Sequence, residues 1–230
     1  MPTHFTNGVS NVTQGHPLYE FGMMDPTKWV AYFNDFNTYA AGDWTITTTE
    51  AGAGNATEAL TDVAGGALLI TNDDADNDAD FFNLVGESFQ YSSTKKMFFR
   101  ARFKISDATQ SDIVMGLQIT DTTPLAVTDG IYFTKADGST AASFVVTKNS
   151  TATTQASVAT MADDTFVTLA FFYNPQSGKF EVFADDSKVA EVVNTNAPDD
   201  ELLTVSFGIQ NGEAAAKTMT LDYVFAAVER

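Results

Sequence analysis

The chain has 230 residues, no cysteine and a formal net charge of −18, from 30 acidic and 12 basic side chains. This length fits one large β domain, and the lack of cysteine excludes disulfides and thiolate metal sites. The acidic balance repels nucleic acid and anionic lipid, and no apolar run approaches the length of a membrane span, so we expect neither nucleic acid nor membrane as a partner.

The first 24 residues are predicted to form an extended N-terminal arm. They are rich in Thr, Asn and Gly, contain Pro2 and Pro17, and show no helical or strand period. Scattered apolar residues make the segment too apolar for a purely disordered tail. We therefore expect the arm to lie along its own domain or along a partner.

Strand patterns begin directly after the arm. Residues 29–36 and 43–49 predict two strands, the second supported by alternating Thr and Ile. Residues 50–66 are small and polar with four Gly, which is typical of a loop or a weak edge strand. Short strands are predicted at 67–71 and 81–85.

An acidic run lies between those last two strands, at residues 73–80. Asp76, Asp78 and Asp80 place carboxylates at alternating positions, as calcium ligands require. An EF-hand is rejected, because Phe81 occupies the position that needs glycine and no helices flank the loop. A calcium site of another kind remains one interpretation. The other is a solvated acidic loop that keeps sheet edges from associating.

Strand patterns then run almost without a break from residue 97 to residue 229. In residues 97–105, apolar side chains alternate with Arg100, Arg102 and Lys104, which predicts a half-buried strand. Further strands are predicted at 113–120, 131–135, 144–148, 166–173, 180–185, 188–193, 202–210 and 218–228. No alternating helices and no repeat period are present.

The economical fold for these strands is an all-β, two-sheet antiparallel sandwich of jelly-roll type, formed by residues 25–230 as one domain. The last strand is apolar on both faces, which indicates a position inside a sheet. We expect it to pair with N-terminal segments, as in jelly rolls.

Catalytic motifs are not recognisable. The only two histidines, His4 and His16, fall in the arm, and the chain has no phosphate loop and no Gly-x-Ser-x-Gly elbow. The Glu-x-Asp-x-x-Glu string that β-sandwich glucanases carry on one strand is also missing. The sequence therefore predicts a protein that is not an enzyme and that uses no cofactor, calcium excepted.

The residues Arg100, Arg102 and Lys104 form the only concentration of positive charge, which we call the basic stripe. It could dock an acidic partner or a neighbouring copy. The alternative is a solvent-facing row that nearby Asp residues neutralise.

Two strands carry a family resemblance. The opening strand reads WVAYFNDF from Trp29, and the closing strand reads LDYV from Leu221. Together they resemble concanavalin A-like (laminin-G-like) jelly rolls. The chain as a whole, from Thr3 to Arg230, is similar to small virion proteins of tailed bacteriophages.

The resemblance implies a capsid decoration (cement) protein that binds the outer surface of the assembled phage head and stabilises it. The implied partners are the major capsid protein and further copies of the chain, as a homodimer or homotrimer, and the implied location is the virion, assembled in the host cytoplasm. The expected partner-binding residues are the basic stripe and the apolar arm anchors Phe5, Val9, Val12, Leu18 and Tyr19. The alternative is a carbohydrate-binding, lectin-like adhesion module with a glycan as partner. The shell protein of a non-tailed virus is a third reading, although the arm lacks the basic residues usual there.

Overall fold

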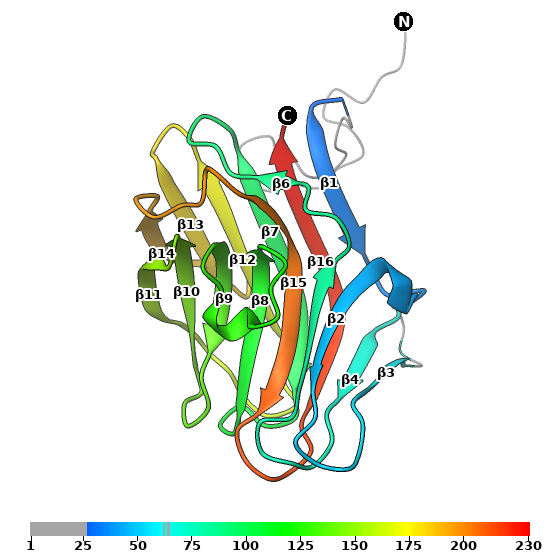
Figure 1. Cartoon of the computed structure of the whole chain (residues 1–230). Helices are drawn as coiled ribbons and strands as arrows, with labels where there is room; N and C mark the ends of the chain where they lie inside the picture. Colours follow the sequence, from blue (N-terminus) through cyan, green and yellow to red (C-terminus); the bar gives the residue numbers. More distant parts are fainter. Residues whose placement is uncertain (1–26, 62, 64) are drawn as a thin grey trace, which may run out of the picture.

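The computed structural model describes residues 27–61, 63 and 65–230, and folds them into two antiparallel β-sheets that pack face to face (Figure 1). This confirms the predicted all-β jelly-roll sandwich. The predicted arm lies outside the described residues. Within the described part, no helix is both long and apolar enough to cross a membrane.

Sheet A has eight strands, in the order β14-β13-β12-β7-β16-β4-β3, with β1 paired to the far end of β16 beyond β4. Its strands are β1 (Trp29–Asn34), β3 (Thr57–Leu60), β4 (Leu68–Thr71), β7 (Met97–Ile105), β12 (Val167–Asn174), β13 (Lys179–Ala184), β14 (Ser187–Val193) and β16 (Thr218–Glu229). The closing strand β16 therefore lies inside the sheet and pairs with the opening strand β1, as the sequence predicted.

Sheet B also has eight strands, in the order β11-β10-β9-β8-β15-β5-β2, with β6 paired to β15. Its strands are β2 (Trp44–Thr49), β5 (Ala79–Leu84), β6 (Phe89–Gln90), β8 (Ser111–Gln118), β9 (Gly130–Lys135), β10 (Ala141–Lys148), β11 (Thr151–Thr160) and β15 (Leu202–Asn211). Two short 3₁₀ turns, η2 (Ala41–Asp43) and η3 (Pro124–Ala126), lie in the connections.

The core lies between the sheets and is rich in phenylalanine. From Phe99 to Ile105 on β7 the buried side chains alternate with half-buried ones, because successive residues of a strand point to opposite faces. Phe99 of β7 stacks on Phe171 of β12 with ring centroids 5.7 Å apart, and Phe144 of sheet B lies 5.4 Å from Phe171. The Phe144–Phe171 contact joins the two sheets, and such apolar packing explains why the chain needs no disulfide.

One connection matters for the site described below. After β1 the chain leaves sheet A, passes through η2 and enters sheet B as β2, an edge strand paired with β5 (Figure 1). Trp44, at the start of β2, is only 5% exposed and packs 4.9 Å from Phe207 of β15. This buried tryptophan fixes where the crossing segment rejoins the sandwich.

Candidate functional site

The acidic loop does not gather its three candidate calcium ligands. Asp76 is exposed, whereas Asp78 is buried and accepts hydrogen bonds from the backbone N–H groups of Ala51 (2.6 Å) and Ala75 (3.0 Å). Asp80 lies on β5 and shares its side with the core residue Phe82. Among the described residues, no group of three or more His, Cys, Asp or Glu is arranged to hold a metal ion. Calcium binding by this loop remains a prediction.

Asp80 is instead a buried carboxyl group between the sheets, 1% exposed. One oxygen accepts a hydrogen bond from Thr48 Oγ1 at 2.7 Å, and the other has no partner. Burial raises the pKa of Asp80 to about 7; the Thr48 bond lowers it, and the charges of Glu58 and Glu50 raise it. The hydroxyl of Tyr39 is also buried without a partner, and burial, Glu58 and Asp80 raise its pKa to about 12. This end of the sandwich therefore contains two buried polar atoms, Asp80 Oδ2 and Tyr39 Oη, that lack a hydrogen-bond partner.

The basic stripe lies on the outer face of sheet A, and each of its side chains is already paired with an aspartate. The pairs are Arg100–Asp186 at 2.6 Å, Arg102–Asp222, and Lys104–Asp164 at 3.5 Å. The ring of Phe166 lies beneath two of the cations, 4.0 Å from the guanidinium of Arg102 and 5.7 Å from the ammonium of Lys104. These contacts support the interpretation of a locally neutralised row. Partner binding by the stripe remains a prediction, and the arm anchors Phe5, Val9, Val12, Leu18 and Tyr19 fall outside the described residues.

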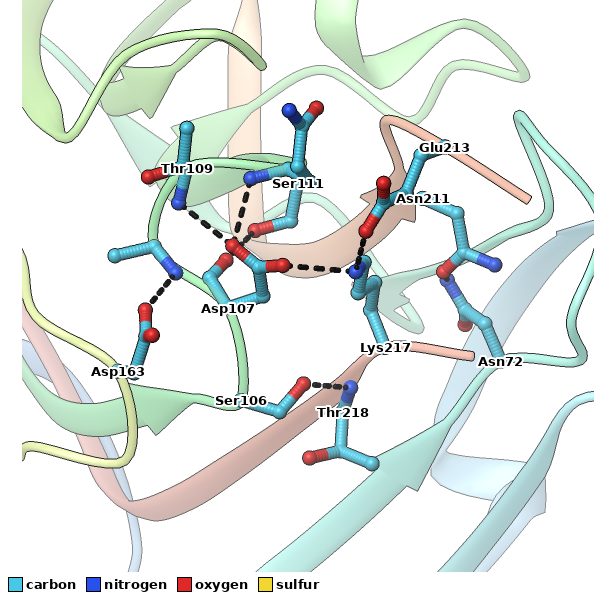
Figure 2. Close-up of polar contacts among 12 residues, drawn as sticks. Asn72, Ser106, Asp107, Thr109, Ser111, Asp163, Asn211, Glu213, Lys217 and Thr218 are labelled. Atoms are coloured by element: carbon cyan, nitrogen blue, oxygen red, sulfur yellow. Dashed lines mark hydrogen bonds and ion pairs between the residues drawn. The ribbon is translucent and has the colours of Figure 1, made fainter. Parts of the chain in front are cut away.

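A second polar cluster joins the loops at one end of the sandwich. Figure 2 shows Lys217 between Asp107 and Glu213, with Nζ–O distances of 2.8 and 2.6 Å. The Lys217 side chain is only 5% exposed. Asp107 also accepts the backbone N–H groups of Thr109 (2.9 Å) and Gln110 (2.8 Å). These bonds join the connection between β7 and β8 to the connection between β15 and β16, so we regard this cluster as a structural tie between loops.

The candidate binding site is an open pocket of about 420 Å³ between the end of β1, η2 and the end of β5. Its lining residues are Tyr32, Gly42, Asp43, Leu84 and Val85. We call this the β1–β5 pocket. Tyr32 comes from sheet A and the end of β5 from sheet B, so the crossing segment that brings Asp43 in completes the pocket.

One side of the pocket packs against the core, and its rim is exposed. Tyr32 packs edge-on against the buried Trp44, with ring centroids 6.1 Å apart. The N–H of Val85 donates to the carbonyl oxygen of Asp43 at 2.9 Å, which ties the end of β5 to η2. Val85 itself is 59% exposed, and a Cβ added to Gly42 would meet nothing within 4 Å. The pocket therefore combines one aromatic side, one apolar side and one carboxylate.

The polar groups of the pocket have a defined hydrogen-bond pattern. Asn34 Nδ2 donates to the hydroxyl oxygen of Tyr32 at 3.1 Å, and Asn34 Oδ1 accepts the N–H of Phe36 at 2.8 Å. Burial raises the pKa of the Tyr32 hydroxyl, the bond from Asn34 lowers it, and the charge of Asp43 raises it. Among the described residues, no group accepts the Tyr32 proton and no group pairs with the Asp43 carboxylate. Both remain available to a ligand.

Sequence analysis did not identify these residues. Tyr32 and Asp43 lie eleven positions apart, on either side of a change of sheet, so no spacing rule links them. The one local signal was the Asn-Asp-Phe run from Asn34 to Phe36, whose asparagine closes a side-chain turn onto the backbone. That signal predicts the turn but not what the turn orients.

No known protein family matches the sequence, and no curated protein is similar to it. Solved structures do share its fold. SCLam, a non-specific endo-β-1,3(4)-glucanase from family GH16, aligns with a TM-score of 0.62 and 16% identity over 90% of this chain and 94% of its own. An endo-1,3-β-glucanase from Streptomyces sioyaensis gives 0.60 and 14% over 90% and 98%. The carbohydrate recognition domain of Emp46p gives 0.56 and 11% over 84% and 94%.

These neighbours correct one prediction. The sequence predicted a protein that is not an enzyme, whereas most of these structures are glycoside hydrolases or lyases. That prediction was wrong because it took the lack of a recognised motif as evidence about the activity of the whole fold. At 11–16% identity the likeness shows a concanavalin A-like fold, and it shows no link to a phage capsid.

Proposed function

We propose that the protein binds carbohydrate and that the β1–β5 pocket is the binding site. The observation that carries the proposal is the pairing of an unused carboxylate, Asp43, with an unused hydroxyl, Tyr32, beside the apolar rim of Val85. Sugars present hydroxyl groups around an apolar C–H surface, so they suit sites that combine both kinds of contact.

The size of the pocket supports a small ligand or one end of a chain. Its volume of about 420 Å³ lies toward the lower end of the range of roughly 300–1,000 Å³ usual for small-molecule sites. Because the pocket is open and presents few polar groups, we expect weak affinity, with a Kd on the order of 0.1–1 mM. The fold supports the same class of ligand, since its structural neighbours include a carbohydrate recognition domain and several glucanases.

The test is binding of the full chain to soluble β-1,3-glucan and to mixed-linkage β-1,3-1,4-glucan, measured by affinity electrophoresis and calorimetry. Gly42→Phe should abolish binding, because Gly42 lines the pocket and has open space at its Cβ position, where a phenyl ring would compete with the ligand. Thr45→Phe is the matched control, since it adds the same ring at an exposed position of β2 outside the pocket. The same incubations are followed for new reducing ends, because several of the structural neighbours are glucanases. Equal binding by both variants would refute the assignment to the pocket.

The capsid role implied by the resemblance remains a prediction, as do the capsid and self-association partners and the virion location. No contact among the described residues favours that role over glycan binding, and its arm anchors fall outside those residues. Its test is co-sedimentation of the full chain with phage heads, which glycan binding does not predict.

A further inference from the structure

We propose that the β1–β5 pocket selects a neutral sugar through a vicinal diol, and that Asn34 is the positioning residue that sets this selectivity. One hydroxyl oxygen of the diol accepts a hydrogen bond from the Tyr32 O–H, and the neighbouring hydroxyl donates a hydrogen bond to the Asp43 carboxylate. This inference rests on the proposed function, because it names the ligand feature that the same site recognises.

The orientation of the Asn34 amide is determined by its backbone partner. The N–H of Phe36 can only donate, so the Asn34 atom 2.8 Å from it must be the oxygen. The amide nitrogen then faces Tyr32, at 3.1 Å from the hydroxyl oxygen. Phe36 is fully buried, which holds its N–H and therefore the amide in place. The usual ambiguity between the two ends of an asparagine side chain is thus resolved by geometry.

This orientation of the Asn34 amide determines where the proton of the Tyr32 hydroxyl points. Its oxygen accepts from Asn34, so its own proton points away from Asn34 and needs another acceptor. Among the described residues no acceptor for that proton is present. The pKa of Tyr32 agrees with this direction, since the Asn34 bond acts to lower it by favouring the charged oxygen. Tyr32 is therefore a donor toward the pocket.

Asp43 supplies the opposite polarity. Its carboxylate can only accept, and it has no hydrogen bond or ion pair from any described residue. A donor and an acceptor that line the same pocket match two adjacent hydroxyl groups, each of which both donates and accepts. The same carboxylate repels an acidic sugar, and so does the net charge of −18. The ligand class is therefore a neutral sugar.

The direct test uses Asn34→Asp, which keeps the shape of the side chain. An aspartate still accepts the N–H of Phe36, but its second oxygen also accepts, so the Tyr32 proton turns toward it and leaves the ligand. We expect affinity to fall by roughly 5–50-fold, the same factor as in Tyr32→Phe. In the double variant the two losses should not add, because both remove one hydrogen bond. Fully additive losses would overturn the role of Asn34, and thermal melts check that each variant is folded.

The ligand feature is tested on methyl β-D-glucopyranoside, its monodeoxy analogues and methyl β-D-glucuronide, by saturation-transfer NMR. The two monodeoxy analogues that each lack one hydroxyl of the recognised diol should lose binding. The glucuronide should not bind. Equal binding of all analogues, or tight binding of the glucuronide, would overturn the proposal.

If the wild-type chain binds no glycan at all, the proposed function fails, and the polarity of Tyr32 is judged by NMR titration of its Cζ. Asn34→Ala removes a bond that lowers the pKa, so the titration midpoint of Tyr32 should rise. An unchanged midpoint would refute the hydrogen-bond direction independently of any ligand.

Discussion

Replacing Asp80 with Asn should remove a pH-dependent loss of stability. Asp80 is 1% exposed, and burial together with the charges of Glu58 and Glu50 raises its pKa from 3.8 to about 7. A carboxyl whose folded pKa is raised holds its proton more tightly in the folded state. The free energy of unfolding therefore falls as pH rises from about 4 to about 7, and the loss is complete above that window.

The size of the effect follows from the shift. A shift of about three units corresponds to a difference of about 4 kcal/mol between the two ends of the window. Asparagine has nearly the same shape, can still accept from Thr48, and does not ionise. We expect Asp80→Asn to match the wild type within about 1 kcal/mol at pH 4 and to exceed its free energy of unfolding by up to about 4 kcal/mol at pH 8.5.

The assay is urea denaturation of both proteins at several pH values between 4 and 8.5, compared as a difference so that other titrations cancel. Asp76→Asn is the matched control, because it removes the same formal charge from an exposed position in the loop before β5. The difference in free energy of unfolding between Asp76→Asn and the wild type should not grow with pH. A difference between Asp80→Asn and the wild type that stays constant with pH, or that shrinks as pH rises, would refute the reasoning.

Three further predictions concern packing and loop contacts. Lys217→Met leaves Asp107 and Glu213 without their shared cation and should lower the free energy of unfolding. The loss should be only about 2 kcal/mol, because the two carboxylates are partly exposed to water. Lys179→Met, the control at an exposed ion pair, should leave the melting midpoint nearly unchanged. Gly208→Ala would press a Cβ against the carbonyl oxygen of Asp80 and should lower the free energy of unfolding by about 1–3 kcal/mol. Gly42→Ala, where a Cβ meets nothing, should melt like the wild type. Asp78→Ala leaves two backbone N–H groups without an acceptor and should lower the free energy of unfolding by about 2 kcal/mol. The calcium prediction is tested separately: calcium should raise the melting midpoint of the wild type but not that of Asp76→Asn.

Alternation of apolar residues was sufficient to predict the middle of each sheet. The strand predicted at residues 97–105 is β7, with the same ends, because one of its faces is core and the other carries the basic stripe. The strand β11 was missed. Apart from the buried Val158 it is built of Thr, Ala, Ser and Gln. As an edge strand of sheet B it exposes most of its side chains, so no apolar period marks it.

The site was harder to predict than the fold. The sequence predicted a loop through Asp80 and a strand beginning at Phe81, so Asp80 was grouped with the acids of the loop, whereas β5 begins at Ala79 and buries Asp80. The β1–β5 pocket depends on where the crossing segment places Asp43 relative to Tyr32 and Val85. Those contacts join two sheets, and single-strand patterns contain no information about them.

Binding of a glucan oligosaccharide at the β1–β5 pocket is tested most directly by NMR titration of the labelled full chain with a β-1,3-linked glucose pentamer. The account predicts that the largest shift changes fall on Tyr32, Gly42, Asp43 and Val85, and that they vanish in Gly42→Phe. Shift changes confined to other surfaces, such as the outer face of sheet A, or changes that persist in Gly42→Phe, would contradict it.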